Sequence, residues 1–178
     1  MKKQIAIFLS AISLLSWAGF TACATEQDGS DTAPIAYELE DFSFALAWNI
    51  YGISSYDSQT GTLIKTKDAP NPEEFSTTYT LTELEVVQIY EIIQQLNVND
   101  YPDKYSPSKY GSDPSLTLIL TVRNGEEVKT ITAMDVPYYT NGKDEQAQNF
   151  LTACKQIVDI LEATDAWKAL PDYPYLYE

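Results

Sequence analysis

Histidine is absent from this chain of 178 residues, and cysteine occurs only twice. Without imidazole, neither a Ser-His-Asp triad nor a Cys-His pair can form, and imidazole-ligated metal sites are excluded as well. Cys23 and Cys154 are the two thiols, so a framework of several disulfides is not available. The sequence therefore predicts no catalytic site of these classes, no metal site and no cofactor.

Basic residues are also scarce. The chain has 11 Lys and Arg against 26 Asp and Glu, which gives a net charge of −15. Without Lys2 and Lys3, 9 basic and 26 acidic residues remain, for a net charge of −17. Such a surface repels nucleic acid and anionic lipid headgroups. We therefore expect no nucleic-acid partner, and we interpret the charge as solubility outside the cell.

An apolar run follows the two lysines, from Ile5 to Phe20, and ends in the tetrapeptide Phe20-Thr21-Ala22-Cys23. The run is short for a transmembrane helix, which needs about 20 apolar residues. Cations before an apolar run and small residues after it are typical of an export signal.

This pattern resembles the signal of bacterial lipoproteins, in which the cysteine receives a diacylglycerol thioether and becomes the first residue of the mature protein. The resemblance covers residues 1–23, and Phe20 stands where that family most often has Leu. It implies a signal peptide over 1–22, lipidation of Cys23 and a membrane partner through the lipid anchor. Ala24 follows the cysteine, which in a Gram-negative host favours the outer membrane or cell surface. In a Gram-positive host the anchor would lie on the outer face of the plasma membrane.

Two other fates of the N-terminal segment stay open. Ala22-Cys23-Ala24 also fits the site of an ordinary secreted protein, cut after Ala24. An uncleaved anchor is the third possibility. Residues 24–32 are polar and predict a flexible tether, so we assign the lipidated cysteine and tether to 23–37, and 38–178 have the size of one domain.

Alternating and helical patterns predict an α+β domain. Residues 42–51 alternate, 62–66 suit a return strand after a turn over 56–61, and 67–78 suit a loop. Thr80 and Glu83 fit a capping box at the start of a helix that runs to Leu96, with Asn97 as a left-handed cap. The inner stripe of this helix comprises Val86, Ile89, Tyr90, Ile93 and Leu96.

The second half of the chain repeats this order. A long loop over 99–114 precedes alternating residues 116–122 and a hairpin at Asn124-Gly125. A two-residue turn would place Leu120 opposite Lys129. We favour a three-residue loop, Arg123-Asn124-Gly125, which places Leu120 opposite Val128. A second helix starts near Asp144, and its stripe comprises Ala147, Phe150, Leu151, Cys154, Ile157, Val158 and Leu161.

The element order is thus ββαββα, by duplication or by coincidence. It predicts an antiparallel four-stranded sheet with both helices packed on one face. The other face is expected to be partly open, with Ser43, Ala45, Asn49, Thr117, Ile119 and Thr121 on it. The layout resembles small extracytoplasmic lipoprotein domains, and no motif in it points to a specific family.

Several residues could in principle carry chemistry. Cys154 lies on the apolar stripe of its helix without a partner to promote the thiolate, so we expect a buried structural cysteine. The stretch 57–61 lacks the spacing of a calcium loop and predicts a hairpin turn. The acidic pairs at 73–74, 83 and 85, and 126–127 fit solvation and helix-dipole compensation, so a carboxylate-based hydrolase is the weakest hypothesis.

The tyrosine-rich loops are the most suggestive feature. The candidate binding residues are Tyr101, Tyr105, Tyr110, Tyr138, Tyr139 and Asn141, with Asp103, Asp113 and Asp144 nearby. Aromatic faces beside Asp and Asn can bind sugars or anchor a protein. The same rings can instead pin long loops to the core. The sequence therefore favours a non-enzymatic envelope protein that serves as a protein-interaction or structural module. The alternative is a glycan- or peptide-binding accessory that uses these loops.

Overall fold

The computed structural model describes residues 39–105, 113–135 and 144–173 of the chain. Seven strands, three α-helices and two 3-10 helices are assigned in these ranges. In chain order they are β1 Phe42–Trp48, β2 Ser54–Asp57, β3 Thr62–Ile64, η1 Pro72–Phe75, β4 Ser76–Thr78, α2 Glu83–Leu96, η2 Val98–Asp100, β5 Lys104–Tyr105, β6 Thr117–Asn124, β7 Glu127–Met134, α4 Glu145–Ala163 and α5 Asp165–Ala169.

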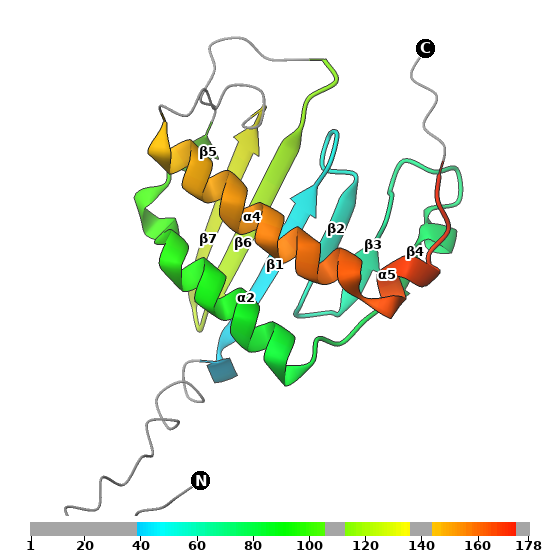
Figure 1. Cartoon of the computed structure of the whole chain (residues 1–178), viewed down its shortest axis with the longest axis horizontal. Helices are drawn as coiled ribbons and strands as arrows, with labels where there is room; N and C mark the ends of the chain where they lie inside the picture. The colour runs from blue at the N-terminus through cyan, green and yellow to red at the C-terminus, as the bar shows by residue number, and fades with distance from the viewer. Residues whose placement is uncertain (1–38, 106–112, 136–143, 174–178) are drawn as a thin grey trace, which may run out of the picture. The chain divides into compact units, whose positions relative to one another are not determined.

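The strands form a single mixed sheet in the order β4-β3-β2-β1-β6-β7-β5 (Figure 1). All neighbouring pairs are antiparallel except β5 and β7, which are parallel. The α+β class is confirmed, but the prediction of an antiparallel four-stranded sheet in the order ββαββα is wrong. The four predicted strands correspond to β1, β3, β6 and β7. β2 is inserted between β1 and β3, and β4 and β5 extend the sheet at its two edges.

The missed strands are too short to show a period of two. β2 has four residues, β4 three and β5 two. The sequence patterns place these residues in a turn or in loops, and each segment becomes a strand through hydrogen bonds to a neighbouring strand. The predicted strand over 42–51 ends at Trp48. Asn49 and Tyr51 have φ of 71° and 54°, and Gly52 has φ of 61°, which turns the chain into β2.

A row of buried side chains crosses five strands and forms the centre of the core. Tyr56 pairs with Leu63 and Leu46, Leu46 with Leu120, and Leu120 with Ile131. Each of these side chains is at most 1% exposed. The alternation of residues 42–51 predicts that Phe42, Phe44, Leu46, Trp48 and Ile50 share the inward face; Phe44, Leu46 and Trp48 are buried, whereas Phe42 and Ile50 are partly exposed.

The β6–β7 hairpin has a register that neither sequence alternative anticipated. Asn124 pairs with Glu127, so the turn is Gly125-Glu126, and Leu120 lies opposite Ile131. This register puts two fully buried residues on one face and leaves Val128 63% exposed. The predicted pairing of Leu120 with Val128 is therefore wrong. The turn sequence favours it, but the register is set by the buried Ile131, which lies three positions further along β7.

Helix α2 starts two residues later than the sequence suggested. Its N-cap is Thr82, whose hydroxyl accepts a hydrogen bond from the Glu85 amide, and the Glu85 carboxylate accepts one from the Thr82 amide. The capping box is therefore Thr82 and Glu85, and not Thr80 and Glu83. The left-handed cap at Asn97 is confirmed, with φ of 50° and ψ of 62°.

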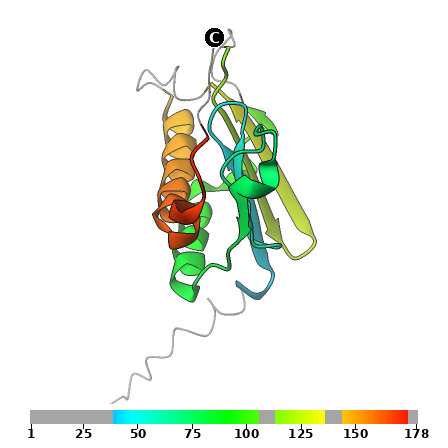
Figure 2. The same cartoon turned by 90° about the vertical axis from the view of Figure 1, so that its right-hand side faces the viewer.

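Helix α4 begins after Asp144, as predicted. The Asp144 carboxylate accepts a hydrogen bond from the Ala147 amide. Five of the predicted stripe residues are fully buried, namely Ala147, Phe150, Cys154, Ile157 and Leu161, whereas Leu151 and Val158 are partly exposed. The helices α2 and α4 lie side by side and cover the same face of the sheet (Figures 1 and 2). The prediction that both helices pack on one face is confirmed.

Candidate functional site

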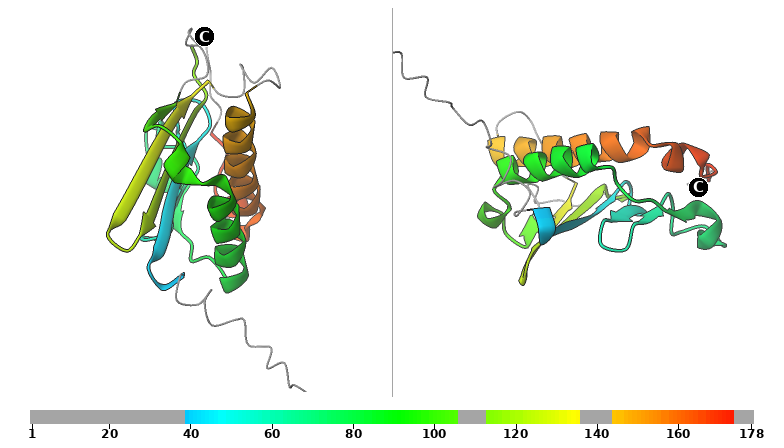
Figure 3. Two further views of the ribbon diagram at one scale, coloured as in Figure 1. Left: turned by 90° about the vertical axis from the view of Figure 1, so that its left-hand side faces the viewer. Right: turned by 90° about the horizontal axis from the view of Figure 1, so that it is seen from below.

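The face of the sheet that points away from the helices is uncovered by any helix that the structure describes (Figure 3). We call the side chains on this side the open face. Its positions follow from the strand registers, because residues that pair across strands point to the same side. Three rows can be traced: Thr78, Thr62, Asp57, Ala45, Thr121 and Thr130; Ser76, Ile64, Ser55, Ala47, Ile119 and Thr132; and Ser43, Arg123 and Val128.

The open face carries little charge, although the chain carries −15. Within the three rows Asp57 and Arg123 are charged, and their side chains pair at 3.3 Å between Oδ2 and Nη2. Lys104 of β5, which pairs with Thr132 at the end of the second row, adds one exposed positive charge at the edge. The remaining positions are Ser, Thr, Ala, Ile and Val. The solvated side of an antiparallel sheet usually alternates polar residues outward. Here apolar side chains such as Ala47 and Ile119 also stand on that side.

A shallow hollow of about 250 Å³ lies in the middle of this face. It is lined by residues of β1, β2, β3 and β6, among them Ala45, Ala47 and Ser55. The hollow exists because the two alanines of β1 are shorter than their neighbours. Beside it, the hydroxyls of Thr121 and Thr130 hydrogen-bond to each other at 3.0 Å, which fixes both side chains across β6 and β7. The surface is thus built of short side chains that lose little conformational entropy on binding.

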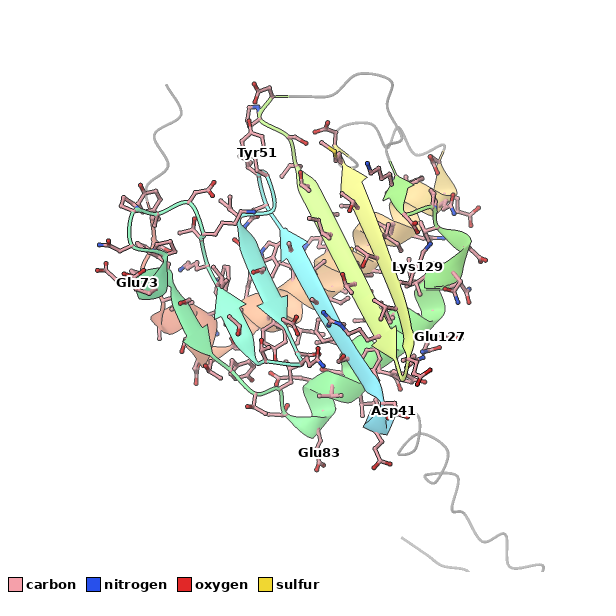
Figure 4. The ribbon with its side chains drawn as sticks, turned by 180° about the vertical axis from the view of Figure 1, so that it is seen from behind. Asp41, Tyr51, Glu73, Glu83, Glu127 and Lys129 are labelled. Carbon is pink, nitrogen blue, oxygen red and sulfur yellow. The ribbon has the colours of Figure 1, made fainter. Side chains whose placement is uncertain are left out.

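Besides the Asp57–Arg123 pair and Lys104, charged side chains lie around the open face. Figure 4 looks onto this face and shows Asp41, Glu73 and Glu127 at its margins, with Tyr51 at the upper end. The three carboxylates give the margin an acidic character, and Tyr51 is 46% exposed. The arrangement is a neutral centre with an acidic rim.

Two of the predicted binding tyrosines are packed into the core. Tyr101 is 4% exposed, and its hydroxyl donates to the Gln146 carbonyl at 2.9 Å. The Tyr105 hydroxyl donates to the Asp144 carboxylate at 3.0 Å. Both rings also lie against Phe150, with centroid distances of 5.4 Å and 6.5 Å. Burial and the bond to Asp144 raise the pKa of Tyr105 to about 12, and burial raises the pKa of Tyr101. These two rings hold the segment before β6 against α4.

The other predicted binding residues, Tyr110, Tyr138, Tyr139 and Asn141, lie outside the described residues, as does Cys23. Their part in binding stays a prediction. The described elements next to them, the end of β5, the start of β6, the end of β7 and the start of α4, lie at the same end of the sheet in Figure 1.

The residues considered for catalysis are placed in structural roles. Cys154 is fully buried, and burial raises the pKa of its thiol well above the usual range, so the thiolate is strongly disfavoured. The Gly61 backbone has φ of 69° in the turn between β2 and β3, as predicted for a hairpin. Within the described residues, no group of three or more carboxylate or thiol side chains could hold a metal ion.

A second hollow, of about 560 Å³, is lined by residues that follow β1 and β3, by Trp167 of α5 and by Asp172 and Tyr173 after α5. The cation at this hollow is Lys65, and residues of the same chain already neutralise and bind its ammonium group. Lys65 Nζ pairs with the Asp172 carboxylate at 2.6 Å, donates to the Leu170 carbonyl at 3.0 Å and lies 5.4 Å from the centre of the Trp167 ring. These contacts attach the C-terminal segment to the sheet, so we do not assign a ligand to this hollow.

The sequence identified part of the open face and missed the rest. Ser43, Ala45, Ile119 and Thr121 were expected there and are there. Asp57 and Ser55 were missed because β2 was taken for a turn. Thr130 and Thr132 were missed because the hairpin register was wrong, although the alternation of Val128, Thr130 and Thr132 was a visible signal of a strand with two different faces.

Among the described residues, no helix is both long and apolar enough to cross a membrane. Compared with known protein families, with curated proteins and with solved structures, the chain shows no match to any of them.

Proposed function

We propose that this chain is a non-catalytic, lipid-anchored module of the bacterial cell envelope that binds a protein partner through its open face. One observation carries the binding part: in a strongly acidic chain, a sheet side without a described covering helix carries little charge and contains short and apolar side chains. Thr is common in strands for reasons of β-propensity. The scarcity of charged side chains on this side nevertheless lowers the cost of removing water on contact.

The dimensions and charges of this surface describe the partner. Six strands about 4.8 Å apart and three rows about 7 Å apart span on the order of 500 Å². This is below the roughly 800 Å² per partner of a standard interface, so we infer a reversible contact. The acidic rim with Asp41, Glu73 and Glu127 favours a partner with a neutral centre and a basic rim. A second copy of this chain would bring two acidic rims together and is disfavoured.

The binding proposal can be tested by site-specific photo-crosslinking in the native host. A photoreactive amino acid at Ile119 samples the open face, and the same group at Asn149, exposed on α4, is the control. We expect a discrete adduct from position 119 that is absent from position 149. Ala47→Glu should abolish the adduct because it buries a charge in the contact, whereas Gln88→Glu, exposed on α2, should leave it unchanged.

The rim adds a salt dependence to the same experiment. Raising the ionic strength to about 0.5 M should reduce the adduct yield, because it screens the attraction between the acidic rim and a basic partner. Identical adducts from positions 119 and 149, or an adduct that survives Ala47→Glu, would contradict the proposal.

The anchor is supported by the tetrapeptide that ends in Cys23 and is tested separately. Cys23→Ser should move the protein from the membrane fraction to a soluble fraction and prevent incorporation of labelled palmitate. If the unaltered chain incorporates no label, the lipid anchor at Cys23 is refuted, and cleavage after Ala24 or an uncleaved anchor takes its place.

A further inference from the structure

One edge of the sheet is only partly covered. β7 runs from Glu127 to Met134, but its outer neighbour β5 pairs with Thr132 and Ala133 alone. Towards the β6–β7 turn, none of the described strands lies beside β7. In the left panel of Figure 3, the lower part of this hairpin projects away from the helices. We call Glu127–Thr130 the free edge of β7.

The backbone of this edge points outward at defined positions. The Thr132 amide donates to the Asp103 carbonyl at 2.8 Å, so its N–H points away from β6 and towards β5. Hydrogen-bonding direction alternates along an antiparallel strand. The N–H and C=O groups of Val128 and Thr130 therefore point outward too, where the described residues provide no backbone partner. Val128 is also 63% exposed.

A groove runs beside the free edge on the helix side of the sheet. Its volume is about 450 Å³, and Val98, Asn99, Val122 and Lys129 contribute to its lining. Lys129 does not close it, because its ammonium group is held at 2.8 Å by the Asp103 carboxylate. A strand added to the free edge would direct alternate side chains into this groove and the others towards the open side of the sheet.

We propose that the free edge of β7 takes up an extended segment of another protein as an additional β-strand. The main-chain groups of Val128 and Thr130 give the hydrogen bonds, and Val98 and Val122 in the otherwise polar groove can contact an apolar side chain of the added strand. The net charge of the chain favours basic residues at the positions between them. The site uses backbone groups that the open-face proposal does not use, so either proposal can fail without the other.

The test uses the mature chain with Cys23→Ser and the peptide acetyl-Lys-Val-Lys-Val-Lys-Val-amide. Hydrogen exchange of single amides is followed by NMR, and affinity by calorimetry. At saturation, exchange at Val128 and Thr130 should slow by about tenfold or more, because both N–H groups gain a partner. Two further peptides, N-methylated at the lysines or at the valines, keep charge and alternation. Only alternate residues of a strand donate their N–H groups to a given neighbouring strand. One methylated peptide should therefore lose these hydrogen bonds and bind about tenfold more weakly than the other.

A matched pair of variants locates the site. Val128→Pro removes an outward N–H, a change that edge strands tolerate, and should weaken binding about tenfold. Val128→Thr keeps the N–H and should bind normally. If Val128→Pro does not fold, the two methylated peptides decide the question on the unaltered edge.

Several results would overturn the inference. Equal affinity of all three peptides would mean that charge alone attracts them. Peptide-dependent protection at Ala45 or Ile119, with none at Val128, would place the peptide on the open face instead. Concentration-dependent protection of Val128 without peptide would identify a second copy as the occupant.

Discussion

Glu85 and Glu83 allow a sharp test of how α2 begins. Both carboxylates lie in the first turn of the helix, but they have different surroundings. Glu85 accepts hydrogen bonds from the Tyr79 hydroxyl at 2.8 Å, the Thr82 amide at 2.8 Å and the Thr82 hydroxyl at 2.9 Å. Glu83 is exposed and points away from the molecule in Figure 4. We expect Glu85→Ala to destabilise the domain clearly more than Glu83→Ala.

The magnitudes follow from what each carboxylate contacts. Both substitutions remove a negative charge near a helix N-terminus, worth about 0.5 kcal/mol at an exposed site. Glu85→Ala also removes half of the capping box, which contributes about 1 kcal/mol. It deprives the Tyr79 hydroxyl of a charged acceptor, for about 1 kcal/mol more at a partly exposed position. We therefore expect about 2.5 kcal/mol for Glu85→Ala, against about 0.5 kcal/mol for Glu83→Ala.

Urea unfolding followed by the fluorescence of Trp48 and Trp167 measures both values, with Cys23→Ser in every variant. Burial raises the pKa of Glu85, but its hydrogen bonds to Thr82 and Tyr79 outweigh this and lower the pKa below 4.5. Its contribution is thus present above pH 4.5 and is lost as the pH falls through the folded-state pKa. The loss of stability in Glu85→Ala should shrink accordingly in acid. Equal effects of the two substitutions at pH 7 would refute the assigned capping box.

Two further predictions concern stability. Gly61→Ala places a Cβ 2.9 Å from the Tyr79 carbonyl oxygen, whereas the nearest atom to a Cβ at Gly52, which also has positive φ, is 3.5 Å away. We expect about 2–3 kcal/mol for Gly61→Ala and about 1 kcal/mol for Gly52→Ala, and equal urea midpoints would contradict the steric argument. Burial raises the pKa of Tyr56 and Tyr105 from 10.0 to about 12. Their contribution to stability is complete below pH 10 and is lost as the pH rises through 12, so urea midpoints should fall between pH 10 and 12 and stay constant between pH 7 and 9.

Long periodic segments were predictable because their pattern is local. α4 spans 19 residues, and its buried positions recur at three and four residues from Ala147 to Leu161. Asp144, which caps the start of α4, and Asn97, which ends α2, are equally local signals. Each acts on the backbone within four residues. The inward residues of β1 and β6 were predictable for the same reason.

Short strands and registers were not predictable in this way. Lys104 and Tyr105 show no strand pattern, and they pair with β7 because Tyr101 and Tyr105 are packed against Phe150. The hairpin register depends on which residue faces Leu120, and Ile131 occupies that position. That choice is made by burial against α2 and α4, which the turn sequence does not contain.

The sequence by itself determined the composition-based exclusions, the α+β class, the two long helices and the expectation of a lipid anchor at Cys23. Each depends on residue types or on short-range periodicity. Only the tertiary structure decided the width of the sheet, the core positions of Tyr101 and Tyr105, and the pairing of Asp57 with Arg123, which lie 66 residues apart. The open face and the free edge of β7 belong to this second group, because both depend on strands brought together from distant parts of the chain.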